Sequence, residues 1–199
     1  EWRSLQKLMT TYVNALPSQV NKDTERIHSV FNQTNTTTGR LSSNNPNLQN
    51  IPIRTKNGRM IRSAFTAKKN NVIISADYSQ IELRVIASMS GDTNMIDAFN
   101  RDEDIHASTA ANVFGVKLSE VTKEQRSHAK IVNFGIIYGV SAFGLSNQTN
   151  LTRTESKLII ENYYNSYPLL KEFMSNQINY ARENGFVKTI VGRKRFLND

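Results

Sequence analysis

Two cations and two aromatic residues follow one another at four-residue steps in a segment with helical periodicity. They are Arg126, Lys130, Phe134 and Tyr138. Steps of four advance about 400° around a helix axis, so the row drifts by only about 40° per step and stays on one broad face. The cations could bind the oxygens of a triphosphate, and the flat rings could stack on a base. The same spacing also fits two core aromatics beside two solvated cations.

One long helix over residues 122–139 must carry this row. Thr122 can accept from the amide of Gln125, whose side chain can reach back, and this pair is a capping box at a helix start. Gly139 is typical of the position that follows a helix. The apolar residues between these ends are Ile131, Val132, Ile136 and Ile137. At about 1.5 Å per residue, the helix would extend over roughly 25 Å.

A carboxylate lies where a predicted strand meets a predicted helix. The run Val-Ile-Ile-Ser-Ala at residues 72–76 predicts a buried strand, which delivers Asp77 to its carboxyl end. Open sheets present their chemistry at that end, and a hard carboxylate suits Mg²⁺. Asp77 could instead cap the helix at residues 79–89, and Glu82 could simply interact with its dipole. Its expected inward residues are Ile81, Val85, Ile86 and Met89, and Gly91 closes it.

Other polar residues are candidates for contacts with anions. His106 lies in the first turn of a helix predicted over residues 105–114, where free amides favour an anion; a structural histidine is the alternative. Asp104 is the expected cap of that helix. Residues 36–54 are rich in Asn, Ser and Thr, which could contact phosphates, sugars or base edges, or could bond their own backbone in turns. The candidates there are Arg40, Asn47, Gln49 and Asn50.

The composition favours an anionic partner. The 199 residues carry a net charge of +8, which points first to nucleic acid and second to a membrane surface. Six cations lie close together: Arg54, Lys56, Arg59, Arg62, Lys68 and Lys69. The lack of Cys excludes disulfides, thiolate catalysis and Cys-bound zinc, and no apolar run is long enough to span a bilayer. The first residues lack an initiator Met, so we expect a fragment of a longer protein.

The rest of the chain predicts an α+β organisation. A helix over residues 1–16 should end at Pro17, and residues 27–34 alternate like a strand. Further helices are expected at residues 93–100, 105–114, 152–166 and 168–184, and a hairpin at residues 186–196. A sheet region would therefore be followed by a helical region, with the division near residue 90.

Five segments together resemble family A DNA polymerases, the bacterial DNA polymerase I family. DYSQIELR at residues 77–84 is similar to motif A of that family, and RSHAKIVNFGIIYG at residues 126–139 is similar to motif B, its fingers helix. The other segments, in the family's order, are TGRLSSNNPNLQNIP at 38–52, DIHASTA at 104–110 and GRKRF at 192–196. The resemblance covers essentially the whole chain, and five motifs in order make it specific.

The resemblance implies catalytic roles in nucleotidyl transfer with two Mg²⁺ ions. It makes Asp77 a ligand of both ions, helped by the backbone carbonyl of Tyr78. Arg126 and Lys130 would bind the incoming triphosphate as catalytic cations. Glu82 would fill the space beside the 2′ position of the sugar and so exclude ribonucleotides.

The resemblance also implies contacts with nucleotide and DNA. His106 would contact the phosphates, Phe134 the sugar and base, and Tyr138 would stack at the template position. The implied nucleotide-binding residues are Tyr78, Gln80, Glu82, His106, Arg126, Lys130, Phe134 and Tyr138. Those implied to lie near the primer–template duplex are Arg40, Asn47, Gln49 and Asn50.

Subdomains, partners and location follow from the same resemblance. Residues 1–20 would be the end of a thumb-side helix and linker, residues 21–90 part of the palm, and residues 91–199 the fingers with a C-terminal hairpin. The partners would be primer–template DNA, deoxynucleoside triphosphates and the remainder of the polymerase chain, with no membrane. We expect a monomer in the bacterial cytoplasm at the nucleoid; a phage or organellar origin stays open.

The chain lacks the family's second catalytic carboxylate, which lies in a His-Asp-Glu motif. We therefore expect DNA synthesis by the full-length protein and little or none by this piece alone. One alternative is a non-catalytic module that binds DNA and nucleotides. Another is a single-subunit RNA polymerase, against which Glu82 argues because such an enzyme must admit the 2′-hydroxyl.

Overall fold

The computed structural model describes residues 1–53 and 55–197, so Arg54 of the predicted cation cluster lies outside the described residues. The chain divides into two compact units, Glu1–Ala76 and Asp77–Asp199. The α+β class expected from the sequence is confirmed, since helices dominate and three small antiparallel sheets accompany them within the described residues.

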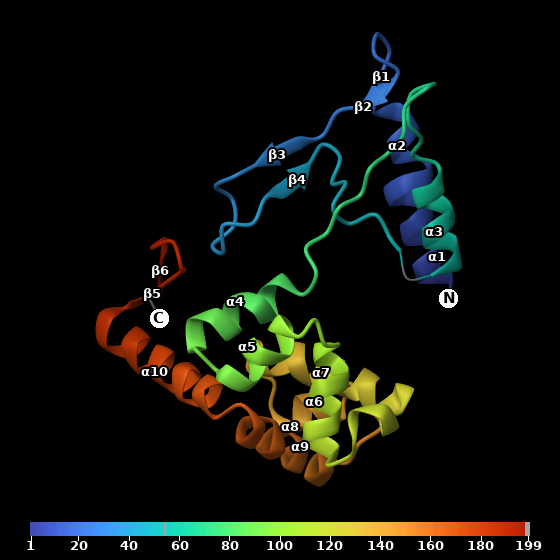
Figure 1. The fold of residues 1–199 in the computed structure, drawn as a ribbon. Coiled ribbons are helices and arrows are strands. Elements are labelled where there is room, and N and C mark those ends of the chain that lie inside the picture. Colours follow the sequence, from blue (N-terminus) through green and yellow to red (C-terminus); the bar gives the residue numbers. More distant parts are fainter. Residues whose placement is uncertain (54, 198–199) are drawn as a thin grey trace. The chain divides into compact units, whose positions relative to one another are not determined.

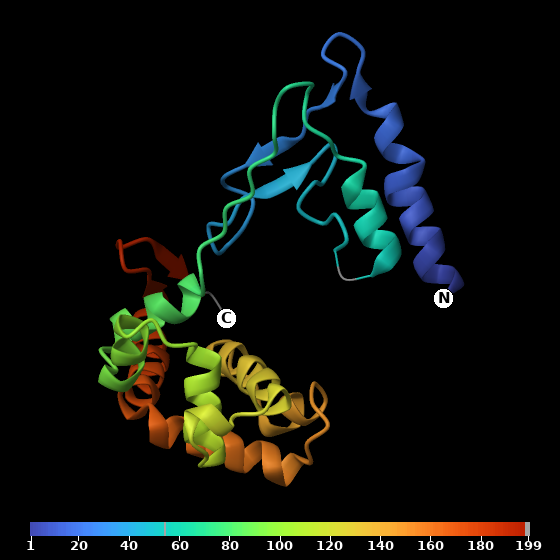
Figure 2. The ribbon, with the colours of Figure 1, turned by 45° about the vertical axis from the view of Figure 1, so that its right-hand side comes forward.

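The first unit begins with one nearly continuous helical segment. It consists of α1 (Trp2–Leu8), a π-helical turn η1 (Met9–Val13) and α2 (Ala15–Ser18). The predicted helix is thus confirmed, although Pro17 lies within its last turn. The rest of the unit consists of α3 (Lys56–Ser63) and two hairpins, β1 (Val20–Asn21) with β2 (Arg26–Ile27) and β3 (Val30–Asn32) with β4 (Ser42–Asn44). The helix α3 lies beside the first helical segment in both views (Figure 1, Figure 2).

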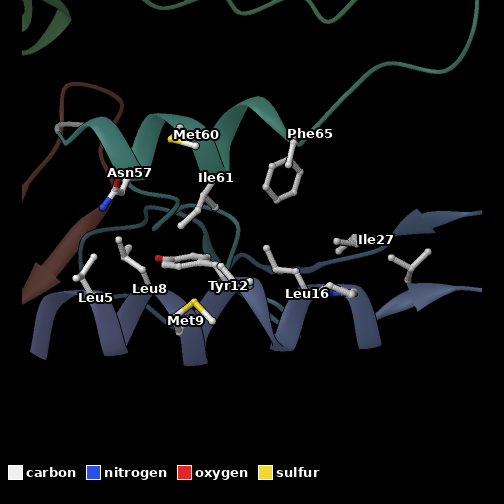
Figure 3. Close-up of a pocket in the computed structure, with 14 residues that line it drawn as sticks. Leu5, Leu8, Met9, Tyr12, Leu16, Ile27, Asn57, Met60, Ile61 and Phe65 are labelled. Atoms are coloured by element: carbon white, nitrogen blue, oxygen red, sulfur yellow. The ribbon is translucent and has the colours of Figure 1, made fainter. Parts of the chain in front are cut away.

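An apolar cleft of about 580 Å³ separates α3 from the first helical segment. Tyr12 and Leu8 lie on one side of it, and Ile61 and Phe65 lie on the other (Figure 3). Tyr12 is the one buried apolar side chain among the described residues of this unit, and its hydroxyl donates to the backbone carbonyl of Asn50. The apolar side chains of this unit therefore line a cleft, whereas those of a larger domain would pack into a filled core.

The strand predicted at residues 72–76 is wrong. These residues form no regular secondary structure, and Val72, Ile73 and Ile74 are 81%, 64% and 85% exposed. A β-branched run becomes a strand only when a neighbouring strand pairs with its backbone groups. No described strand pairs with this run.

The second unit is a helical bundle that ends in a hairpin (Figure 1). Its helices are α4 (Ile81–Ser90), α5 (Thr93–Asn100), α6 (Ile105–Phe114), η2 (Leu118–Glu120), α7 (Lys123–Ile137), α8 (Ala142–Ser146), α9 (Arg153–Ser166) and α10 (Pro168–Asn184). The hairpin pairs β5 (Phe186–Lys188) with β6 (Lys194–Phe196). The predicted helices from residue 93 onward and the hairpin are confirmed, and the capping box predicted for α7 is present. A second capping box, formed by Thr152 and Glu155, begins α9.

The core of this unit is continuous from α4 to α10. Its largest fully buried apolar side chains are Leu83, Met95, Ile105, Val132, Ile136, Leu145, Tyr163, Tyr167 and Leu170. The inward face predicted for α4 was partly wrong, because Leu83, Ile86 and Ala87 form the buried stripe whereas Ile81 is 44% exposed. Positions i, i+3 and i+4 share one side of a helix, and Ile81 precedes that stripe.

The packing boundary between the units falls before α4. This helix contacts α5 and α10, so it belongs with the second unit rather than with the residues that precede it. The two compact units divide between Ala76 and Asp77, earlier than the division near residue 90 that was expected between a sheet region and a helical region. The assignment of residues 1–20, 21–90 and 91–199 to thumb, palm and fingers stays a prediction.

Candidate nucleotide-binding face

The helix α7 divides sharply into a buried side and an open side. Thr122 Oγ1 accepts from the Gln125 amide at 3.1 Å, and Gln125 Oε1 accepts from the Thr122 amide at 2.9 Å. Ala129, Val132, Asn133 and Ile136 are buried against the core. Three members of the predicted row, Arg126, Lys130 and Tyr138, are exposed, and Phe134 is half-buried. The alternative in which both aromatics are core residues is therefore wrong for Tyr138, which is 65% exposed.

A groove of about 470 Å³ runs along this open side. Lys130, Phe134 and Tyr138 line it, together with Val140 and Gln148 from the residues that follow the helix. Cationic, aromatic and amide groups thus share one concave surface, as a ligand with both charged and flat parts requires.

The structure brings Glu82 to the same face. The hydroxyl of Tyr138 donates to Glu82 Oε2 at 2.7 Å, which joins the end of α7 to the first turn of α4. The two residues are 56 positions apart in the sequence. The contact therefore places a carboxylate at the aromatic end of the row, opposite in character to its cationic end.

Asp77 does not cap α4. The N-cap position is occupied by Gln80, which has a φ of 52° and makes no side-chain cap bond. Asp77 and Tyr78 precede it as exposed residues. The capping alternative for Asp77 is therefore wrong.

The donor set around Asp77 is incomplete for two Mg²⁺ ions. Among the described residues, no group of three or more His, Cys, Asp or Glu lies close enough together to hold a metal ion. The Asp77 carboxylate and the Tyr78 carbonyl are oxygen donors of the kind that Mg²⁺ prefers. Further ligands would have to come from outside these residues.

Asp104 joins the cationic end of the row to the start of α6. Its Oδ2 accepts from Arg126 Nε at 2.6 Å, while its Oδ1 accepts from the amides of His106 and Ala107 at 3.0 and 3.2 Å. Partial burial acts to raise the pKa of Asp104, but the bonds from Arg126 and the two amides outweigh it and lower the pKa overall. The carboxylate is therefore ionised and engaged on both oxygens.

His106 is buried rather than open to solvent. It is 3% exposed, its Nδ1 lies 3.0 Å from Asn133 Nδ2, and its ring centroid lies 5.8 Å from that of Phe134. Burial lowers the pKa of His106; Asp104 opposes this effect, whereas Arg126 and Lys130 reinforce it. These contacts agree with the structural alternative, and the contact with phosphate stays a prediction.

The candidate DNA contacts in the first unit are all exposed. Arg40, Asn47, Gln49 and Asn50 lie in or beside turns. The side chain of Asn47 accepts from the Gln49 amide at 3.0 Å, which is the local bonding that the turn alternative described. Their contact with a duplex stays a prediction.

Sequence reasoning missed Asn133 and saw Asp104 only as a cap. Asn133 is fully buried, and its one signal is an amide residue at a position where α7 faces the core. Neither the Asn133 contact with His106 nor the Asp104 contact with Arg126 leaves a trace in local spacing, since 27 and 22 residues separate the partners.

Comparisons with known proteins agree over the full length of the chain. A family model described as DNA polymerase family A matches residues 1–199. The DNA polymerase I of Caldicellulosiruptor bescii is 47% identical over 199 residues, all of this chain and 23% of the relative. The DNA polymerase I of Chloroflexus aurantiacus is 50% identical over 198 residues, with coverage of 100% and 21%. The chain thus spans less than a quarter of the length of these relatives.

A solved structure has the same fold. It is described as the POL domain of Pol1 from M. smegmatis in complex with DNA primer-template and dNTP, and it matches with a TM-score of 0.87 and 41% identity. The match covers 98% of this chain and 34% of that one. No helix in the described part of this chain is long and apolar enough to cross a membrane.

Proposed function

Because the chain belongs to DNA polymerase family A, we propose that it forms the nucleotide-binding part of an enzyme that copies a DNA template. The reaction transfers a nucleotidyl group from a deoxynucleoside triphosphate to the 3′-hydroxyl of a primer and releases pyrophosphate. The observation that carries the proposal is the open side of α7. There, two cations, a half-buried Phe and an exposed Tyr follow one another, and three of them line one groove.

Each end of this row suits one part of a nucleotide. Arg126 and Lys130 neutralise the triphosphate, whose transfer requires charge stabilisation more than covalent chemistry from the protein. Phe134 packs on the sugar and base at the middle of the groove. Tyr138, which is hydrogen-bonded to Glu82, ends the row; Glu82 occupies the space beside the sugar and Tyr138 takes the template side.

Two contacts of the resting state oppose nucleotide binding. Arg126 is bonded to Asp104, and Tyr138 is bonded to Glu82, so phosphate must compete for the guanidinium and the template base must displace the phenol. Binding of the correct nucleotide can thereby be coupled to a movement of α7, which is induced fit.

Asp77 and the carbonyl of Tyr78 would hold Mg²⁺ with ligands supplied by the remainder of the polymerase chain. The metal would activate the primer oxygen and stabilise the leaving pyrophosphate. Gln80, at the start of α4, belongs to the proposed nucleotide-binding set, and residues 38–52 contribute Arg40, Asn47, Gln49 and Asn50 to the primer–template surface. We further propose that the full-length protein acts as a monomer at the bacterial nucleoid.

Primer extension tests the proposal. With Mg²⁺ and all four deoxynucleotides, the full-length protein should extend a primer, Asp77→Asn should abolish extension, and the 199-residue chain alone should be inactive. Robust extension by the chain alone that depends on Asp77 would contradict the need for outside ligands. Extension by the full-length protein that Asp77→Asn leaves intact would contradict the role of Asp77.

A non-catalytic binding module is the second candidate, favoured because no group of three or more His, Cys, Asp or Glu in the described part of the chain could hold a metal ion. It predicts that the chain binds DNA with an affinity that falls steeply with salt, because bound cations release counterions from the phosphates. It also predicts that the full-length protein binds nucleotide without turnover. The extension assay therefore separates the two candidates.

A further inference from the structure

A chain of buried hydrogen bonds leads from the junction of α9 and α10 to His106. The Tyr167 hydroxyl lies 3.2 Å from Thr109 Oγ1, which lies 3.1 Å from Asn133 Oδ1. Asn133 Nδ2 then lies 3.0 Å from His106 Nδ1. Tyr167, Thr109 and Asn133 are at most 1% exposed, so water does not compete for these bonds.

The donor and acceptor properties of these groups determine the direction of each hydrogen bond in the series. A carboxamide oxygen can only accept, so the Thr109 hydroxyl donates its proton to Asn133 Oδ1. Thr109 Oγ1 must then accept from the Tyr167 hydroxyl. Burial raises the pKa of Tyr167, so this phenol keeps the proton that it donates.

The same logic determines the protonation of His106. A carboxamide nitrogen can only donate, so His106 Nδ1 accepts from Asn133 Nδ2 and carries no proton. Burial lowers the pKa of His106, and Arg126 and Lys130 reinforce this effect against Asp104, which keeps the ring neutral. A neutral imidazole has one N–H group, which must therefore be on Nε2.

We propose that Asn133, oriented by Thr109, is a positioning residue that fixes His106 as the Nε2–H tautomer, so that the ring can bind an acceptor only as a donor. The acceptor is a phosphate oxygen of the incoming nucleotide, and this assignment rests on the proposed function. Phosphate oxygens only accept, so the opposite tautomer would turn a lone pair toward them. The fixed tautomer supplies a donor without requiring an additional proton.

The tautomer can be measured without nucleotide or activity. In the ¹⁵N-labelled chain, long-range proton–nitrogen spectra distinguish protonated from unprotonated ring nitrogens, and a His106→Gln variant assigns the His106 signals. We expect an unprotonated Nδ1 and a protonated Nε2 at neutral pH. A protonated Nδ1, or a rapidly exchanging mixture of tautomers, would overturn the proposal.

A pair of substitutions at Thr109 tests whether this residue orients Asn133 and thereby fixes the tautomer of His106. Thr109→Val removes the donor that orients Asn133 at nearly constant shape, whereas Thr109→Ser keeps the hydroxyl. The Val variant should show mixed tautomers and the Ser variant a single Nε2–H ring, with circular dichroism to verify that both fold. A single Nε2–H ring in the Val variant would refute the role of Thr109.

Asn133→Asp should reverse the direction of the hydrogen bond between residue 133 and His106. A carboxylate can only accept, so His106 Nδ1 should become protonated in this variant. If the variant does not fold, the Thr109 pair still decides the question.

Addition of a deoxynucleoside triphosphate then separates this proposal from the proposed function. A shift of the His106 Nε2–H signal on titration supports both. A fixed tautomer whose Nε2–H signal does not respond to triphosphate supports positioning by Asn133 and contradicts the phosphate contact of His106. In the full-length protein, Thr109→Val should raise KM for the nucleotide about threefold to tenfold with a smaller change in kcat, and Thr109→Ser should not.

Discussion

Asp104 makes two contacts with different roles, one at the start of α6 and one with Arg126. One carboxylate oxygen caps α6, and the other holds Arg126, the cation proposed to bind triphosphate. The side chains of this ion pair are 45% and 41% exposed, so water weakens their attraction. Such a pair contributes about 0.2–1 kcal/mol, enough to compete with a ligand but not to exclude it.

Asp104→Asn should therefore tighten nucleotide binding. Asn caps a helix about as well as Asp, so α6 keeps its start while Arg126 loses its charged partner. We expect the Kd for a deoxynucleoside triphosphate to fall by about 1.5-fold to 5-fold, which corresponds to the energy of the exposed pair. Fluorescence titration with a labelled nucleotide measures this Kd.

Glu103→Gln is the matched control for this prediction. It removes a neighbouring carboxylate that is bonded to Arg101 and Ser108 rather than to α7. It should leave the Kd unchanged. Weaker binding by Asp104→Asn would mean that Asp104 holds Arg126 in its productive position and does not compete with the ligand.

His106 should make the stability of the chain depend on pH. Its pKa is lowered in the folded state, so the unfolded chain binds more protons between the folded pKa and the unfolded value of about 6.5. The free energy of unfolding should therefore fall as the pH drops through that window. The charged groups that act on the ring are Asp104, which opposes the shift, and Arg126 and Lys130, which reinforce it.

Urea unfolding at about pH 7.5 and about pH 5.5, on either side of the unfolded value, checks this prediction. His106→Gln should flatten the difference between the two conditions. Asp104 acts in a separate window, because its lowered pKa gives stability that is present above about pH 3.9 and lost as the pH falls through its folded pKa. An equal slope in His106→Gln would assign the pH dependence to other groups.

At the scale of elements, Asp92 ties two helices together. Its Oδ1 accepts from the Met95 amide at 3.2 Å at the start of α5. Its Oδ2 accepts from the amides of Leu169 and Leu170 at 3.1 and 3.3 Å at the start of α10. The carboxylate is 1% exposed, so its negative charge is compensated by the free amides and dipoles of two helix N-termini.

Asp92→Ala should destabilise the chain by about 2–4 kcal/mol, because buried amides at two helix starts lose their acceptor. Thr122→Ala, which removes the exposed cap of a single helix, should cost only about 1 kcal/mol. The urea midpoint at a constant m-value measures both. Equal losses in the two variants would show that Asp92 acts on one helix only.

Local signals made the helices predictable but could not show that residues 72–76 form no strand. The ends of α7 and α9 are encoded by capping boxes a few residues long, and Gly115 and Gly185 adopt the left-handed conformation that ends α6 and α10. The strand expected at residues 72–76 required a partner, which no local pattern supplies. Element ends are local properties, whereas strand pairing depends on another part of a chain.

The candidate site shows the same division. The row on α7 was predictable because a period of about four residues places its members on one side. The bonds of Arg126 with Asp104 and of His106 with Asn133 were not, because they depend on how α6 packs against α7. Spacing identified the residues that line the face but not the residues that hold them in place.

For the whole molecule, the buried apolar residues are distributed very unevenly. The core cluster lies entirely between Leu83 and Leu170, in the second unit. In the first unit, among the described residues, only Tyr12 is a buried apolar residue, and the cleft between α3 and the first helical segment stays open (Figure 3). Hydrophobic burial is the main term that offsets the conformational entropy lost on folding, so the two units should differ in stability.

We therefore expect residues 77–199 to fold alone and residues 1–76 not to. Residues 77–199 alone should keep a helical circular dichroism spectrum and unfold in one cooperative urea transition. They contain the whole core cluster and the Asp92 bonds between α5 and α10. Residues 1–76 alone should lack a cooperative transition, because their helices face an unfilled cleft. In the intact chain, amide exchange should be slow in α6, α7 and α9 and fast in α1 and α3. Cooperative unfolding of residues 1–76 alone, or slow exchange in α1, would show that the first unit is stabilised by something other than apolar burial.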